Sequence, residues 1–277
     1  MKKYFIIFVK KNLNVINITD DKKYEYLKIV IALLLFILPF FWYHGGNLLL
    51  GEDDVGLIYL DPINNIKTMV GISTWWSSGN IAVYNPLVIY EIPFALFLTI
   101  IRFLTFGLVN LQQFAFGLIL SLSFIFIVNL MQFFTKQKSS AFFIAGLFYS
   151  LSPSFFVMEY FYLMPSTFNI ALYPILSYFF LKGYETHKNR YYLIGSIFTF
   201  IFARSFFNPP YGVAFFSLSL IFLVVYNQIK KRKFIYLLRE IIKNIFFIIL
   251  INAFLFIQII YSLFLKNNAI LGVLNEK

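Results

Sequence analysis

Long apolar stretches follow one another along this chain, with short polar connections between most of them. Seven are close to the roughly 20 residues that an α-helix needs to cross the apolar core of a bilayer. They cover about 27–44, 113–134, 140–158, 165–182, 191–208, 212–229 and 241–265. None shows the alternating apolar and polar pattern of a membrane β-strand. The pattern therefore predicts seven membrane-spanning helices.

An eighth apolar segment, about 90–106, is shorter and contains Glu91, Pro93 and Arg102. The basic residues of the connections indicate its placement, because Lys and Arg gather on the cytoplasmic side of membrane proteins. If 90–106 lies along the outer surface, most of the 23 Lys and Arg residues fall on the cytoplasmic side, together with the N-terminus. If it crosses the membrane, every later connection changes side and the bias is lost. We therefore expect a surface helix.

The predicted architecture is an all-α, polytopic transmembrane bundle. Residues 1–26 form a cytoplasmic N-terminal segment, and residues 27–265 form the membrane domain, in which 45–106 is an outer loop followed by the surface helix. Residues 266–277 form an outer C-terminal segment, and whether the chain is truncated there is left open. The expected location is the cell membrane.

Composition narrows the classes of protein. The chain of 277 residues is 60% hydrophobic and 13% charged, whereas a soluble domain carries roughly 25% charged residues. This excludes a soluble globule, because too little polar surface is available. The net charge of +11 does not indicate nucleic-acid binding, since the basic residues are scattered at the ends of predicted spans. The absence of cysteine excludes thiolate metal sites and cysteine nucleophiles.

The outer loop at about 45–89 is much longer than a usual inter-helix connection, and it concentrates acidic residues. Glu52, Asp53, Asp54 and Asp61 lie within ten residues. Neighbouring carboxylates near an apolar surface have a raised proton affinity, which suits a general base. Their hard oxygens are also ligands for a divalent cation, and Glu52, Asp53 and Asp54 are the candidate ligands.

A structural role is the alternative for these carboxylates. The loop is then a solvated acidic segment in which Asp61 caps a short helix over 62–72. Pro62 supports that helix, because proline is favoured in the first helical turn.

Further polar and aromatic residues are predicted on the same outer side. Arg204 lies about one turn inside the end of a span, where it can hold a phosphate bidentately or extend to the interface. Trp75 and Trp76 suit the headgroup region. Glu159 and Asn208 also lie at outer ends of predicted spans. Together with Arg204 and the tryptophans, they are candidates for binding a donor substrate.

The order of these motifs resembles the GT-C membrane glycosyltransferases, and more narrowly the α-(1→3)-arabinofuranosyltransferase-like group. The matching residues are Glu52-Asp53, Asp61-Pro62, Trp75-Trp76, Pro86 and Leu151-Ser152-Pro153. The resemblance covers about 45–210. Glu52 replaces the glycine of the family motif, and seven spans are fewer than such enzymes usually have.

The resemblance implies an enzyme that moves a sugar from a polyprenyl-phosphate donor to a hydroxyl of a glycan or protein on the outer side, with inversion. Asp53 is then the base, and Asp54 or Asp61 orients Asp53 or the acceptor. Arg204 would neutralise the departing phosphate, an assignment that rests on its charge and depth in the span and not on the resemblance. The alternative is a non-catalytic membrane subunit, or a flippase or transport component of envelope glycan assembly. A partner membrane subunit is expected if the chain is one part of a split enzyme.

Overall fold

The computed structural model describes residues 21–42, 57–67, 76–78, 81–83, 90–152, 168–203 and 209–257. Within these residues the chain is helical, apart from one short antiparallel hairpin of β1 (Trp76–Ser78) and β2 (Ile81–Val83). The predicted helical class is therefore confirmed for the described part, with the hairpin as an addition inside the long loop.

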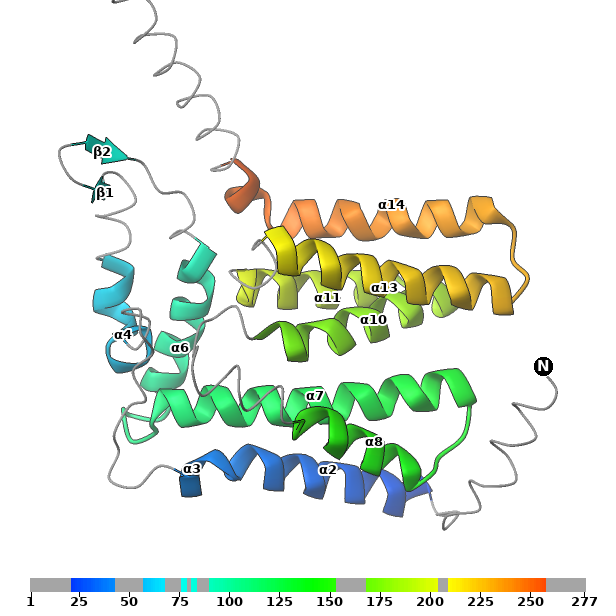
Figure 1. Ribbon diagram of the computed structural model, residues 1–277, viewed down its shortest axis with the longest axis horizontal. Helices are drawn as coiled ribbons and strands as arrows, with labels where there is room; N and C mark the ends of the chain where they lie inside the picture. The colour runs from blue at the N-terminus through cyan, green and yellow to red at the C-terminus, as the bar shows by residue number, and fades with distance from the viewer. Residues whose placement is uncertain are drawn as a thin grey trace, which may run out of the picture.

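The longer helices run side by side in two layers (Figure 1). One layer holds α2, α7 and α8, and the other holds α10, α11, α13 and α14. Helix α7 joins the layers, because it packs against α2, α8 and α10. The bounds are α2 (Asp21–Ile37), α3 (Pro39–Trp42), α4 (Leu57–Leu60), α6 (Ile92–Leu104), α7 (Leu111–Thr135), α8 (Ala141–Ser150), α10 (Asn169–Thr186), α11 (Asn189–Ile201), α13 (Pro209–Ile229) and α14 (Phe234–Ile251).

Two helical segments of the described chain, Asp21–Phe41 and Leu111–Thr135, are long and apolar enough to cross a membrane. The seven predicted spans are thus confirmed as helices in their described parts, but not as seven spans. The described helices α8 and α11 are 10 and 13 residues long. Helix α14 begins at Phe234 rather than 241, and within it Glu240 forms ion pairs with Arg239 and Lys243.

Helix α6 runs across one end of the bundle instead of alongside its helices (Figure 1). Its 13 residues extend about 20 Å, which is less than a bilayer core requires. Phe94 and Leu98 pack inward, whereas Ile100 and Phe103 are exposed. Helix α6 therefore lies across one end of the bundle, and its position at a membrane surface stays a prediction.

Helix α14 buries polar side chains and exposes apolar ones. Glu240, Asn244 and Asn252 have no exposed surface, while Ile242 and Phe246 are more than half exposed. The buried groups face α11: Tyr192 Oη donates to Glu240 Oε2 at 2.6 Å, and Asn252 Nδ2 donates to Thr199 Oγ1 at 2.9 Å. The interior of this helix pair is therefore more polar than its surface.

Close backbone approach holds α2 against α7. A methyl group at Gly117 of α7 would overlap the carbonyl oxygen of Phe36 in α2. A backbone carbonyl cannot avoid this overlap by changing rotamer, as a side chain can. Only glycine therefore fits at this position. Small residues serve the same purpose in packed membrane helices.

We expect Gly117→Ala to destabilise the bundle, because α2 must move away to accommodate the methyl group. Overpacking of this kind costs about 1–3 kcal/mol, and the midpoint of thermal unfolding in detergent should fall by several degrees. Gly195→Ala is the matched control, since its nearest contact would be an ordinary 3.4 Å to Phe179 Cβ. Equal midpoints for the two variants would contradict the close packing of α2 and α7.

Candidate functional site

Asp61 lies between α4 and a helical segment at 62–67. Its Oδ1 accepts a hydrogen bond from Asn64 N at 3.2 Å, and its backbone oxygen accepts one from Asn65 N at 2.9 Å. The first bond is a side-chain cap for an N–H group that the first helical turn leaves free, and the second is the first backbone hydrogen bond of the helix. The predicted cap and the start of the helix at Pro62 are confirmed, whereas the expected end at 72 lies outside the described residues.

Arg102 of α6 connects the long loop to the surface helix. Its Nη1 donates to the Leu60 carbonyl oxygen at 2.7 Å and lies 3.7 Å from Asp61 Oδ1. The side chains of Arg102 and Asp61 are 43% and 53% exposed, so the ion pair itself contributes at most about 1 kcal/mol. The hydrogen bond to the Leu60 carbonyl is the stronger restraint, because bonds made by charged donors contribute about 1.5–3 kcal/mol. The carboxylate stays open to solvent and to a substrate.

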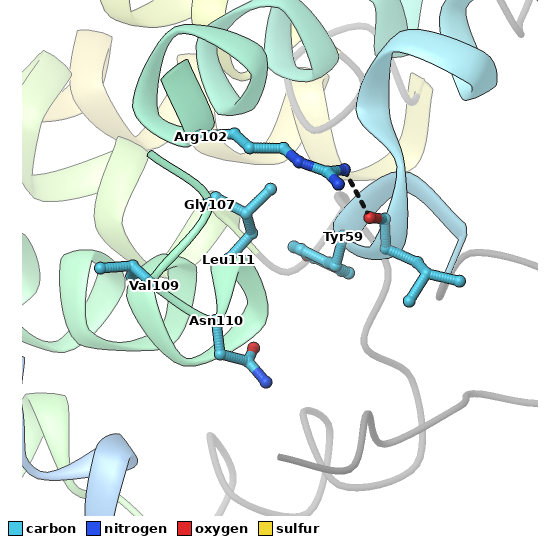
Figure 2. Close-up of a pocket in the computed structure, with 7 residues that line it drawn as sticks. Tyr59, Arg102, Gly107, Val109, Asn110 and Leu111 are labelled. Carbon is cyan, nitrogen blue, oxygen red and sulfur yellow. Dashed lines mark hydrogen bonds between the residues drawn. The ribbon is translucent and has the colours of Figure 1, made fainter. Parts of the chain in front are cut away.

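A pocket opens beside this arginine. Its volume is about 160 Å³, and its lining residues are Tyr59, Leu60, Arg102, Gly107, Val109, Asn110 and Leu111. Figure 2 shows Arg102 and Asn110 at opposite sides of the pocket, with Tyr59 and Leu111 between them. Three elements therefore form the pocket: the end of α6, the start of α7, and α4, which is distant in sequence from the other two.

Asn110 gives the pocket a second polar group. Its Oδ1 caps α7 by accepting from Gln112 N at 3.0 Å and Gln113 N at 3.2 Å. Because the oxygen is used in the cap, the amide nitrogen is the group that Asn110 can offer to a ligand. The positive end of the α7 dipole lies at the same place.

The pocket favours a small polar or anionic ligand group. The Arg102 guanidinium, the Asn110 amide and the α7 N-terminus all supply positive charge or N–H donors. The volume corresponds to about five water molecules, which suits one phosphate group rather than a whole lipid-linked sugar. Asp61 adds an acceptor beside Arg102, and a hydroxyl group is its natural partner.

Most of the predicted site residues lie outside the described residues, and their placement stays a prediction. These residues are Glu52, Asp53, Asp54, Trp75, Glu159, Arg204 and Asn208. Trp76 is described in its backbone, where it begins β1 and pairs with Val83. Asp61 is the predicted catalytic residue whose surroundings are seen, and they join it to Arg102.

Metal binding also stays a prediction. The described residues contain no group of three or more His, Cys, Asp or Glu side chains that could hold a metal ion. The candidate ligands Glu52, Asp53 and Asp54 are not among the described residues. The structure therefore does not test a divalent cation at this loop.

Sequence reasoning did not place Arg102, Tyr59 or Asn110 in a site. A signal for Arg102 existed, because it is the one cation in the apolar segment 90–106 and follows a strongly acidic loop. Asn110 precedes a long apolar run, which is the pattern of a helix cap. Tyr59 carries no comparable signal, since one tyrosine among 19 is not distinctive.

Comparison with known protein families, with characterised proteins and with solved structures finds no match for this chain. The resemblance to GT-C glycosyltransferases therefore stays a prediction from the sequence. The roles of individual residues rest on their own chemistry and contacts.

We expect Arg102→Met to release the loop from α6, because methionine keeps the apolar stem and removes both polar contacts. Amide hydrogen exchange at 57–67 should become about tenfold faster, which corresponds to a loss of about 1.4 kcal/mol in local stability. Lys67→Gln, an exposed cation of the same segment, is the control and should leave exchange unchanged. Unaltered exchange in Arg102→Met would show that this arginine does not hold the loop.

Proposed function

We propose that this chain is an integral membrane protein that acts as a glycosyltransferase with a lipid-linked sugar donor. The main support for a membrane location is the distribution of polar and apolar side chains between the interior and the surface of the bundle. Glu240, Asn244 and Asn252 are fully buried, whereas Phe148 and Phe234 are 75% and 71% exposed. Water as the surrounding solvent would favour the opposite arrangement.

The apolar surface of the bundle supports the same proposal. The exposed faces of α2, α8, α11, α13 and α14 all carry large aliphatic or aromatic side chains. Leaving one such side chain in water costs about 1.5–3 kcal/mol relative to burying it. Contiguous apolar surface on this scale is typical of proteins whose surface meets lipid or another protein.

The distribution of charge supports one orientation. The start of α2, the α7–α8 connection, the α10–α11 turn and the α13–α14 turn lie at one end of the bundle (Figure 1). Lys138 joins two of them through its 3.2 Å contact with Asp21. The basic residues of these four segments therefore gather at one end, while Lys67 and Arg102 lie toward the α4–α6 end. By the positive-inside tendency, the basic end and the N-terminus are cytoplasmic.

The absence of native cysteine allows a direct test of this orientation with the single substitutions Lys67→Cys and Lys231→Cys. Both positions are exposed. A membrane-impermeant maleimide added to intact cells should label Lys67→Cys, and should label Lys231→Cys only after the cells are opened. The reverse pattern would invert the topology, and labelling of both in intact cells would end the multi-span proposal. The unsubstituted chain, which has no cysteine, measures the background labelling.

The glycosyltransferase part of the proposal is supported by the Asp61–Arg102 pair. These residues place an accessible carboxylate and a guanidinium beside a small polar pocket. The pocket lies where the long loop meets the surface helix, which is the headgroup level in the proposed orientation. A phosphate at Arg102 would have a carboxylate nearby to contact an incoming hydroxyl.

The proposed reaction is a direct displacement. Asp53 takes the proton of the acceptor hydroxyl as its oxygen bonds to the anomeric carbon. The bond from that carbon to the phosphate oxygen breaks, and the phosphate leaves with the electron pair. Arg102 neutralises the leaving phosphate, the role that the sequence also predicts for Arg204. Asp61 orients the acceptor, and the anomeric carbon is inverted.

Transfer from a polyprenyl-phosphate sugar should fall at least about 100-fold in Asp53→Asn, which removes the base. Asp61→Asn should also lower transfer while the protein stays folded, because asparagine caps a helix as well as aspartate does. Asp21→Asn, at the opposite end and 82% exposed, is the charge-matched control. Wild-type transfer by Asp53→Asn would remove the base assignment.

A non-catalytic membrane subunit is the second candidate, and one observation favours it. Asp61 already caps a helix and contacts Arg102, so its presence is explained without chemistry. The wild-type chain would then bind no polyprenyl-phosphate sugar and transfer none. That result, in a protein that passes the labelling test, would favour the subunit over the enzyme.

A further inference from the structure

At the basic end of the bundle, two carboxylates each hold a pair of cations. Glu185 binds Lys230 Nζ at 3.2 Å and Arg232 Nη2 at 3.3 Å. Burial alone would raise the pKa of the Glu185 carboxyl, but the hydrogen bond from Lys230 and the positive charges of Lys230 and Arg232 hold that pKa below its usual value. Glu240 similarly binds Lys243 at 3.0 Å and Arg239 at 3.2 Å. The cations bound by Glu185 and Glu240 therefore have a structural role.

A second group of cations at this end is different. Lys182, Lys188 and Arg190 surround Tyr191, and within the described residues none of the three forms an ion pair with a carboxylate. Lys182 Nζ lies 5.1 Å from the centre of the Tyr191 ring, and Arg190 Cζ lies 4.9 Å from it. Arg190 Nη2 also donates to Tyr191 Oη at 3.0 Å. Like charges are thus held together without a neutralising partner.

The backbone adds to this positive charge. Lys188 occupies the cap position of α11, and no side chain accepts a hydrogen bond from the first N–H groups of that helix. These groups form the positive end of the helix dipole. An anion beside Lys188 and Arg190 would interact with the two side chains and with the helix N-terminus at once.

An apolar strip continues from the cations along α11. Arg190, Ile194 and Ile197 follow one another at spacings of four and three residues, so they share one face of the helix. Leu193, Ile194 and Ile197 are each more than a third exposed. The strip begins within one helical turn of the positive group. A nucleic acid or a soluble acidic protein would have no use for this adjoining apolar surface.

We propose that Lys182, Lys188 and Arg190 bind the phosphate of an anionic phospholipid whose acyl chain lies along Leu193, Ile194 and Ile197. The site takes a phosphodiester headgroup at one end and a hydrocarbon chain at the other. It rests on the membrane location proposed above and is independent of the glycosyltransferase assignment. The bound lipid joins α10 to α11 from outside the bundle.

The test compares lipids by their effect on the thermal unfolding of the purified protein in mild detergent. Dioleoylphosphatidylglycerol should raise the midpoint at a lower concentration than dioleoylphosphatidylcholine, whose phosphate is balanced by choline. In Lys182→Gln/Arg190→Gln, the concentration of phosphatidylglycerol for half the effect should rise about 10- to 30-fold, as expected for the loss of two juxtamembrane charges. Lys182→Arg/Arg190→Lys keeps both charges and should retain the response.

Lys231→Gln is the matched control, because it removes an exposed cation at the same end but outside the cluster. An equal loss of the phosphatidylglycerol response in Lys231→Gln would show that the overall positive charge of this end, and not a specific site, attracts the lipid. That result would overturn the proposal. If glycerol 3-phosphate stabilises the protein as much as phosphatidylglycerol does, the cluster binds a free phosphate. That result would contradict the proposal of a bound phospholipid. An unchanged response in the double glutamine variant would also overturn it. If the cysteine-labelling test fails, the proposed membrane location is wrong. If the protein is inserted in the membrane but is not stabilised by phosphatidylglycerol, only the lipid site is wrong.

Discussion

The Glu240 carboxylate is fully enclosed, and every interaction it makes comes from the protein itself. Tyr192 of α11 donates to one oxygen at 2.6 Å, while Lys243 and Arg239 contact the other at 3.0 and 3.2 Å. A buried carboxylate without such partners would be strongly destabilising. This requirement fixes the rotation of α14 about its axis and its pairing with α11. The same rotation turns apolar residues of α14 such as Ile242 and Phe246 outward.

Similar polar contacts occur elsewhere inside the bundle. Ser177 and Ser219 join α10 to α13 at 3.0 Å, and Asn252 meets Thr199 at 2.9 Å. In a surrounding of low polarity, apolar side chains gain little by leaving it for a helix interface, so hydrogen bonds and close packing provide the specificity. Glycines allow that close packing: Gly183 of α10 accommodates the ring of Tyr192, the same tyrosine that binds Glu240.

The two ends of the bundle use charge differently. At the basic end, Glu185 and Glu240 form ion pairs with cations, and Lys182, Lys188 and Arg190 lie around Tyr191. At the opposite end, Arg102 connects α6 to the α4 segment and leaves a small polar pocket beside Asp61. The first arrangement suits the surface of an anionic membrane. The second provides the combination of guanidinium and carboxylate that transfer of a phosphate-linked group requires.

The placement of 90–106 at a membrane surface stays a prediction, but the sequence by itself determined the helical class, the approximate helix positions and the cap at Asp61. These features depend on local pattern: apolar runs, basic connections, and proline after aspartate. It did not determine that α14 begins at Phe234, because Arg239, Glu240 and Lys243 interrupt the apolar pattern. Only the tertiary structure shows that Glu240 forms ion pairs with the two cations inside the helix. Nor did it determine the pocket. Arg102 and Asn110 flank the short connection between α6 and α7, but Leu60 lies 42 residues before Arg102. Only the tertiary packing of α4 beside this connection brings Leu60 to them.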